Sequence, residues 1–318
     1  MLNISGILLF CVGLSAVLSV RVKKSAYESS EQIEPYIDNY SAAPEPDLGS
    51  VTIPKISPEA WMKNEVELVD SATSRYVGSA TIKDAASFLE GEFRRLGLDI
   101  LIDEFDCGLS PSGRCKNIIG RRVGSVSDSV LVGAHYDSLP TEGEAPGADD
   151  NASGVATLLA VAQALASRNL KRNLIFAAFS GEEQGMQGSS HFMESIGPTF
   201  NIKAAVILDQ DGNPGKSGGV ILESVGDSKD KLRVIDTLAH SVDHGIASIN
   251  VNHHGFGSDH VPLSEGGIPA VLVIERDNML FSKKYGHTVK DTIDKIDSQY
   301  GSAIARTVEN AVVRLAMG

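Results

Sequence analysis

Four apolar segments of this chain are each followed by a residue that can bind a divalent cation. They cover residues 130–134, 174–179, 204–208 and 270–274. None of them alternates polar with apolar residues, a pattern typical of strands covered on both faces in a mostly parallel sheet. Such sheets bind their ligands beyond the carboxyl ends of the strands. We therefore expect the polar residues after these segments along one edge of a sheet, and we predict a metal site there.

The residues that follow the segments are of the types that bind metals and move protons. They are His135 and Asp137 after the first segment, Glu182 and Glu183 after the second, Asp209 after the third, and Glu275 with Arg276 after the fourth. A carboxylate next to a metal-bound imidazole fixes its tautomer, which suits a His-x-Asp sequence. Two carboxylates are costly to bury unless they hold a cation or share a proton. Taken singly, each pattern also fits a solvated pair or loop.

Two further groups of residues extend this set. Asp149, Asp150 and Asn151 stand where a helix of small residues begins, and His287 lies in a loop before the last helix. One residue of the tract is expected to cap the helix, but a cap needs only one side chain. Two histidines with several carboxylates suit borderline cations, chiefly zinc. Because three carboxylates and one hydroxide neutralise two Zn²⁺ ions, this set matches a two-metal cluster that activates water.

The spacing of apolar residues predicts alternating helices and strands in one catalytic domain, residues 57–318. Helices are expected over 58–71, 81–96, 152–166, 230–242 and 302–317, and strands over 99–106, 116–122 and 129–134 besides the apolar segments. Such alternation is typical of α/β proteins. We therefore predict a three-layer αβα fold around a mostly parallel, mixed central sheet. With 318 residues, of which 42% are hydrophobic, the chain can bury that core.

An apolar stretch at the amino end predicts a secretory signal peptide over residues 1–19. It is short for a bilayer-spanning helix of about 20 residues. An uncleaved anchor, followed by Arg21, Lys23 and Lys24, is the alternative. Residues 20–56 are polar and contain several prolines, which favours a propeptide or a linker. We expect a secreted protein without stable membrane association once the signal is removed.

The cysteines agree with export. Cys11 would leave with the signal, so Cys107 and Cys115 remain as an even pair across a turn with Gly and Pro. They form either a disulfide, as in an oxidising compartment, or two buried thiols. Asn39 begins a sequon for N-glycosylation. The formal net charge of −13 argues against nucleic acid as a partner, because its recognition needs a basic surface.

Six pieces of sequence occur in a fixed order in the predicted catalytic domain. They are His135-x-Asp137, the segment from Gly147 to Gly154, Glu182-Glu183, Leu208-Asp209, Gly257-Ser-Asp-His260 and His287-Thr-x-x-Asp291. In this combination the chain resembles the co-catalytic dizinc aminopeptidases of metallopeptidase clan MH, of the leucyl aminopeptidase and aminopeptidase Y type. The resemblance implies a zinc-peptidase, phosphorylase/hydrolase-like fold, two Zn²⁺ ions per chain, and peptide or protein substrates with a free N-terminus.

The resemblance also implies roles for individual residues. Asp150 would bridge both zinc ions, and the peptide bond between Asp150 and Asn151 would be cis. The remaining ligands would be His287 and Glu183 for one ion, and His135 and Asp209 for the other. Glu182 would be the general base that deprotonates the bridging water and later protonates the leaving amine. Asp137 would orient the imidazole of His135.

Two positions leave alternatives open. Some members of the family donate a tyrosine hydroxyl to the developing oxyanion from a region where this chain has Phe256. Zinc alone, or another donor such as Tyr285, would then stabilise that charge. Asp259 and His260 are interpreted either as groups beside the pocket or as a hydrogen-bonded pair beneath the sheet edge.

Other proteins of this fold are alternatives to an aminopeptidase. A glutaminyl cyclase, which is an acyltransferase, uses nearly the same ligand positions with one zinc, but its pocket is rich in tryptophan. This chain has a single tryptophan, Trp61. A carboxypeptidase or dipeptidase needs a cation for the substrate's carboxylate, and Arg276 is the candidate. A non-catalytic ectodomain would have lost its metals, whereas this chain keeps all five ligand positions and the base.

Overall fold

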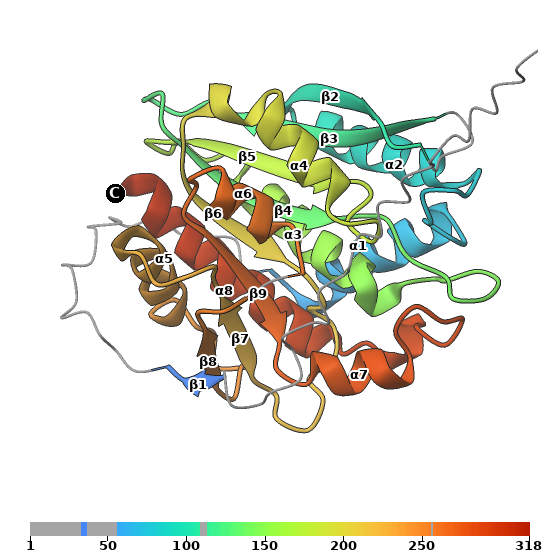
Figure 1. Ribbon diagram of the computed structural model, residues 1–318. Coiled ribbons are helices and arrows are strands. Elements are labelled where there is room, and N and C mark those ends of the chain that lie inside the picture. The colour runs from blue at the N-terminus through green and yellow to red at the C-terminus, as the bar shows by residue number, and fades with distance from the viewer. Residues whose placement is uncertain (1–32, 37–55, 109–112, 256) are drawn as a thin grey trace, which may run out of the picture. The chain divides into compact units, whose positions relative to one another are not determined.

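One mixed sheet of nine strands lies at the centre of the structure, a computed structural model that describes residues 33–36, 56–108, 113–255 and 257–318. The strands are β1 (Glu34–Pro35), β2 (Asp99–Asp106), β3 (Arg114–Arg122), β4 (Ser129–His135), β5 (Asn173–Phe179), β6 (Ile202–Leu208), β7 (Val220–Glu223), β8 (Ile249–Asn252) and β9 (Ala270–Glu275). Their order is β1-β8-β7-β9-β6-β4-β5-β3-β2 (Figure 1). The four apolar segments therefore form the neighbouring strands in the middle.

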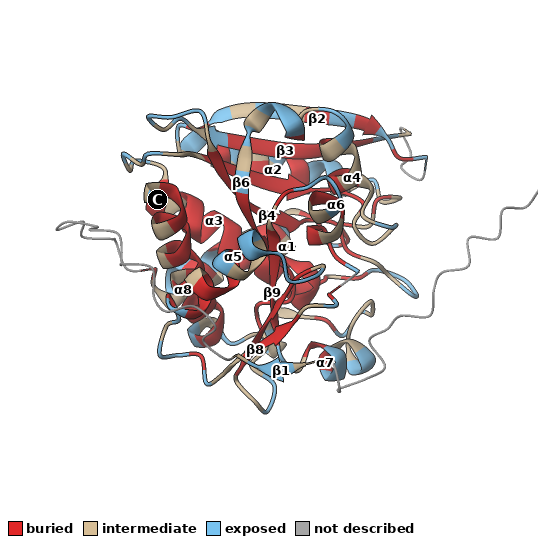
Figure 2. Ribbon diagram, turned by 60° about the vertical axis from the view of Figure 1, so that its left-hand side comes forward, coloured by how far each residue is buried: buried red, intermediate tan, exposed pale blue. Residues whose placement is uncertain are grey.

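The middle of the sheet is parallel and its flanks are mostly antiparallel. β4 pairs in parallel with β5 and β6, and β6 pairs in parallel with β9. β3 joins β5, and β7 joins β9, in the antiparallel sense. The central strands are buried along almost their whole length (Figure 2). The prediction of an α/β fold around a mixed sheet is confirmed, with parallel pairing confined to the centre and to the β7–β8 pair.

Helices cover both faces of the sheet. They are α1 (Pro58–Ser71), α2 (Ile82–Arg95), α3 (Gly154–Leu165), α4 (Gln187–Glu194), α5 (Lys229–Ala239), α6 (His260–Glu265), α7 (Asn278–Lys284) and α8 (Ser298–Met317). Alternate residues of β4 point to opposite faces. Val130 and Val132 share an apolar cluster with α1, α2, α3, α5 and α8. Leu131 instead packs in a cluster with Phe192 of α4 and Leu263 of α6.

The elements that the sequence did not predict are short. β7 and β8 have four residues each, and α4, α6 and α7 have eight, six and seven. Segments of that length hold too few apolar residues to display a period. The last helix begins at Ser298 rather than at 302, because the Asp297 side chain accepts hydrogen bonds from the backbone N–H groups of Gln299 and Tyr300, at 2.9 and 3.3 Å.

The segment predicted as propeptide or linker contributes one short strand. Glu34 and Pro35 pair antiparallel with Val251 and Asn250 of β8. Residues 1–32, with the predicted signal peptide, and 37–55, with the sequon at Asn39, lie outside the described residues, so those predictions stay predictions. Among the residues described, no helix combines the length and the apolar composition needed to span a bilayer.

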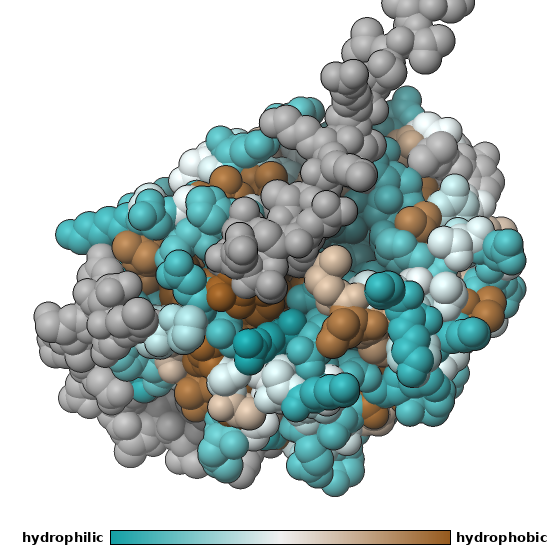
Figure 3. Space-filling model, turned by 60° about the horizontal axis from the view of Figure 1, so that its bottom comes forward, coloured by the Kyte–Doolittle hydropathy of each residue, from teal (hydrophilic) through white to brown (hydrophobic). Residues whose placement is uncertain are grey.

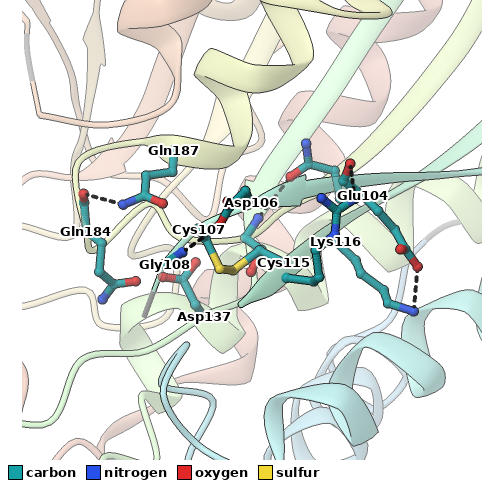
Figure 4. The surroundings of a disulfide bond; sticks show 12 residues. Glu104, Asp106, Cys107, Gly108, Cys115, Lys116, Asp137, Gln184 and Gln187 are labelled. Carbon is teal, nitrogen blue, oxygen red and sulfur yellow. Dashed lines mark hydrogen bonds and ion pairs between the residues drawn. A yellow bond between two sulfur atoms is a disulfide. The ribbon is translucent and has the colours of Figure 1, made fainter. Parts of the chain in front are cut away.

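A disulfide bridges the turn between β2 and β3. Cys107 and Cys115 are bonded with their Cα atoms 5.7 Å apart, which confirms the disulfide interpretation over two free thiols. The bridge packs in a small apolar cluster with Val77 and Phe105. Figure 4 shows Asp137 and Gln184 among its surroundings. The hairpin is thus closed covalently close to the turn that carries Glu182 and Glu183.

Candidate metal centre

The side chains predicted to bind metal gather at the carboxyl ends of the central strands. His135 is the last residue of β4, and Asp209 directly follows β6. Glu183 lies in the turn after β5, and Asp150 in the kinked segment Ala148–Ser153 that precedes α3. His287 comes from the loop after α7. The sheet thereby brings together residues that are up to 152 positions apart, as the parallel arrangement predicted.

The five side chains form two groups that share Asp150. In the first group, Nε2 of His135 lies 3.4 Å from Oδ1 of Asp209 and 3.5 Å from Oδ1 of Asp150. In the second, Nε2 of His287 lies 3.1 Å from Oε2 of Glu183 and 3.2 Å from Oδ2 of Asp150. Within each group the potential ligand atoms lie within 4.8 Å of one another. Asp150 thus turns one oxygen toward each histidine, as a bridging carboxylate would.

Asp291 and Asn151 hold Asp150 in place. The Asp291 carboxylate accepts hydrogen bonds from the backbone N–H groups of Asp149 and Asp150, at 2.8 and 3.0 Å. The Asn151 side chain donates to the carbonyl of Leu208 and accepts from the N–H of Gly154 at the start of α3. Asn151 is therefore the capping residue of the tract, which leaves the Asp150 side chain free for another role. The peptide bond between Asp150 and Asn151 is cis, as the resemblance implied.

Asp137 positions both the turn after β5 and the imidazole of His135. Its carboxylate accepts hydrogen bonds from the backbone N–H groups of Glu182 and Glu183, at 3.2 and 3.3 Å. Its Oδ1 lies 3.7 Å from Nδ1 of His135, and its backbone carbonyl lies closer to that nitrogen, at 3.2 Å. The sequence predicted the contact with the imidazole but not the bonds to the turn, because those need the β4–β5 register.

Burial and crowding shift the pKa values of the gathered groups. Burial, and next the charge of Asp150, raise the pKa of Glu183 to about 7. Hydrogen bonds to Asp150 and Glu183 raise the pKa of His287 to about 10. Burial opposes the charged form of His135, but the charges of Asp209 and Glu182 outweigh it and raise its pKa well above the usual value. The carboxylates of the site therefore favour a positive charge next to them, either a protonated imidazole or a cation.

The donor atoms fit zinc. Imidazole nitrogens and carboxylate oxygens are ligands that Zn²⁺ accepts, in sets of three or four. Oε1 of Glu183 is buried and has no hydrogen-bond partner among the described residues. A buried carboxylate oxygen without a partner is costly, and a cation would relieve that cost. Two zinc sites that share Asp150, one with His135 and Asp209 and one with His287 and Glu183, are consistent with this geometry.

Glu182 lies beside these five ligand side chains, which we call the cage, and its pKa is strongly shifted. Its Oε2 is 4.0 Å from Nε2 of His135, and its side chain is 10% exposed. Burial raises its pKa well above the usual value, and the charges of Glu183, Asp209 and Asp259 add to the shift, whereas His135 opposes it. The raised pKa favours the protonated form of Glu182, and a carboxyl group that takes up and releases a proton can act as a general acid and base.

Three further residues support the cage and were not singled out for this from the sequence. Ser258 donates to Oδ2 of Asp209 at 2.8 Å. Gln210 donates through Nε2 to Oδ2 of Asp150 at 3.4 Å and accepts a hydrogen bond from Ser282. The fully buried Arg75 donates to the carbonyls of Tyr136 and Gly147, both at 2.7 Å. Of the three, only Ser258 lies in a motif noted in the sequence, Gly-Ser-Asp-His, which could have indicated its place near the ligands.

Asp259 and His260 do not form the hydrogen-bonded pair that was one of the two interpretations. Asp259 accepts instead from the Ser189 hydroxyl at 2.5 Å, and burial raises its pKa to about 7. The imidazole of His260 is buried, and burial lowers its pKa to about 3. Asp259 lies close enough to Glu182 for its charge to raise the pKa of Glu182.

Other candidates lie apart from the cage or outside the described residues. Glu275 is buried and accepts from the backbone N–H of Asn213 at 2.7 Å, whereas Arg276 is exposed. The ring of Tyr285 lies beneath the ammonium group of Lys284, 4.6 Å from its centroid. Phe256 lies outside the described residues. Neither group of potential metal ligands includes Glu275.

Replacing Gln210 by Met is expected to weaken zinc binding about 10–100-fold, because partners that orient metal ligands contribute that much. Gln210 is buried, has a φ of 56°, and reaches Asp150 with its amide. Zinc affinity would be measured by competition with a chelator. Gln163→Met is the matched control, since the amide of Gln163 on α3 bonds Asn64 away from the cage. Equal affinities of Gln210→Met and the wild type would remove Gln210 from this role.

Known proteins resemble the chain in sequence and in fold. A family model described as Peptidase family M28 matches residues 117–312. Aminopeptidase YwaD of Bacillus subtilis is 30% identical over 192 residues, which are 58% of this chain and 41% of that protein. A probable leucine aminopeptidase of Trichophyton verrucosum is 28% identical over 221 residues, 63% of this chain and 56% of that protein. The chain therefore spans about half the length of these relatives.

Solved structures share the fold. The zinc aminopeptidase BSAP from Bacillus subtilis superposes with a TM-score of 0.72 at 19% identity, covering 82% of this chain and 95% of that one. The Legionella pneumophila aminopeptidase LapA superposes with a TM-score of 0.70 at 21% identity, covering 83% of this chain and 73% of that one. At these identities the likeness establishes the architecture of the chain.

Proposed function

The chain belongs to peptidase family M28, and from that premise we propose that it is a secreted zinc-dependent aminopeptidase that removes N-terminal residues from peptides. One observation carries the proposal: Asp150 turns one carboxylate oxygen to each of two groups of ligand-type side chains. The names of the relatives, aminopeptidase and probable leucine aminopeptidase, support the same substrate class. The disulfide supports secretion, because such bonds persist in oxidising compartments.

Residues of this chain would divide the chemistry among them. When bound, two zinc ions would polarise the scissile carbonyl and lower the pKa of the attacking water. His135, Asp150, Glu183, Asp209 and His287 would hold them. Glu182 would take a proton from that water and give it to the leaving amine, for which its raised pKa and low exposure suit it. Asp137 would keep Glu182 and Glu183 in position through its bonds to their backbone.

Metal removal tests this proposal directly. We expect about two zinc ions per chain by elemental analysis, hydrolysis of leucyl amide, loss of that activity with a chelator, and recovery when zinc is returned. N-acetyl-leucyl amide should resist cleavage, because an aminopeptidase needs the free amine. One zinc per chain with acyl transfer to form pyroglutamate would favour the glutaminyl cyclase alternative. Cleavage of acetylated peptides from their carboxyl end would favour a carboxypeptidase.

A further inference from the structure

We propose that the surface around His287 binds the part of a peptide that follows the cleaved bond, and that it favours acidic residues there. This inference deepens the aminopeptidase proposal and rests on it. The surface, which we name the basic rim, consists of exposed residues on α7 and in the loop after it. They are Met279, Leu280, Lys283, Lys284, Val289 and Lys290.

The cage is closed at one end and open at the other. The side chain of His135 is 1% exposed and that of Asp209 is 9% exposed, whereas that of His287 is 39% exposed. Asp259 is buried near Glu182 at the closed end, and its carboxylate suits a positively charged amino group. A peptide that enters with its N-terminus toward the closed end must therefore continue past His287. The part after the cleaved bond then meets the basic rim.

Hydrogen bonds link α7 and the loop after it, which carry the rim, to the cage. Both the backbone N–H and the hydroxyl of Thr141 donate to the carbonyl of His287 at 2.8 Å. Ser282 of α7 donates to Gln210, which in turn donates to Asp150. A Cβ placed on Gly143 would lie 3.9 Å from the Val289 side chain, so the two loops approach closely there. These bonds hold the segments that carry the rim next to the metal ligands.

The rim is basic on a chain that is acidic as a whole. Lys283, Lys284 and Lys290 are exposed, and among the described residues none of the three has an ion-pair partner. The nearby Asp291 is buried and accepts backbone hydrogen bonds, and Asp294 pairs with Lys295. These three positive charges contrast with the formal net charge of −13. They complement carboxylates of a bound peptide and repel its lysines and arginines.

Apolar side chains lie among these lysines. Met279, Leu280 and Val289 are 49%, 63% and 56% exposed, which is high for such residues. Figure 3 shows the face to which α7 belongs, where apolar patches alternate with hydrophilic side chains. A surface of this kind suits an extended peptide that carries both apolar and acidic residues, because each type finds a partner on it.

Distances along the chain set the positions that the rim can reach. Lys284 and Lys290 stand three residues before and after His287, so at most about 11 Å separates their Cα atoms from that of His287. An extended peptide advances about 3.3 Å per residue. The second to fourth residues after the cleaved bond therefore pass within reach of the ammonium groups. Each exposed ion pair is expected to change binding by up to about five-fold.

The test compares two peptides with free N-termini, Leu-Ala-Glu-Glu-Ala amide and Leu-Ala-Lys-Lys-Ala amide, at low ionic strength. In the wild type we expect kcat/KM to be about ten-fold higher for the acidic peptide, and salt to reduce that ratio. In the double variant Lys284→Glu/Lys290→Glu the ratio should fall below one. The control Lys203→Glu/Lys229→Glu makes the same charge change at exposed lysines away from the cage and should keep the wild-type ratio.

Cleavage of leucyl anilide, which ends at the cleaved bond, reports whether the catalytic centre works in every variant. If leucyl anilide is cleaved but the wild type shows no preference between the peptides, or the preference survives in the rim variant, the rim proposal is wrong while the aminopeptidase proposal stands. If leucyl anilide is not cleaved at all, the proposed function itself fails. Binding of the rim to vesicles with anionic lipid, without any peptide preference, would assign this surface to a membrane instead.

Discussion

Replacing Glu182 by Gln is expected to lower kcat for leucyl amide by about 10²–10⁴-fold while the zinc content stays that of the wild type. Glutamine keeps the size of the side chain but cannot accept a proton from water. Glu182 belongs to neither group of potential metal ligands, so its loss should leave both groups intact. The measurement pairs steady-state kinetics with elemental analysis of the same preparation.

A control separates proton transfer from a general change in charge. Glu142 is exposed in the loop after β4, and Glu142→Gln removes the same charge without touching the cage. That variant should retain wild-type kcat. If Glu182→Gln kept near-wild-type turnover, Glu182 would have no part in the chemistry. If it lost zinc along with activity, Glu182 would act as a ligand rather than as a base.

The middle of the fold could be predicted from the sequence, because burial on both faces leaves a local mark. β4, β5, β6 and β9 appear as apolar runs whatever surrounds them, and such runs form parallel sheets. β7 and β8 leave no comparable mark. Each has four residues, and their place in the sheet depends on pairing with β9 and β1 rather than on their own composition. The strands toward the edge of the sheet could therefore be identified only from the structure.

The candidate ligands could be predicted for the same reason, since each stands at or just after an apolar strand or in a recognisable motif. The residues that position them could not. Arg75 donates to Tyr136, which lies 61 positions further along the chain, and no local pattern marks a loop arginine as buried. No pattern in the sequence around Gln210 indicates that its amide donates to Asp150. Contacts of this kind arise from tertiary packing, which local patterns in a single sequence do not indicate.

Replacing Asp150 by Asn is expected to abolish activity and to weaken the binding of both zinc ions together. Asp150 is the one residue common to the two groups of potential ligands. Asparagine keeps the shape and the side-chain volume but carries no negative charge, so two cations would lose their shared counter-charge. The backbone N–H groups that Asp291 accepts from are unchanged, so the loop should keep its place. Zinc titration with a chelator, together with thermal unfolding with and without zinc, measures the effect.

Asp209→Asn separates a shared ligand from one that serves a single ion. Asp209 belongs only to the group with His135, so this variant should weaken one zinc and leave the other close to its wild-type affinity. A ligand that binds only the folded state stabilises it by an amount that grows with the logarithm of its affinity, so zinc should raise the Tm of Asp209→Asn but hardly that of Asp150→Asn. Loss of a single zinc in Asp150→Asn, with the second bound as tightly as in the wild type, would show that Asp150 does not bridge. The two groups would then be independent sites, and the charge argument that joins them would fail.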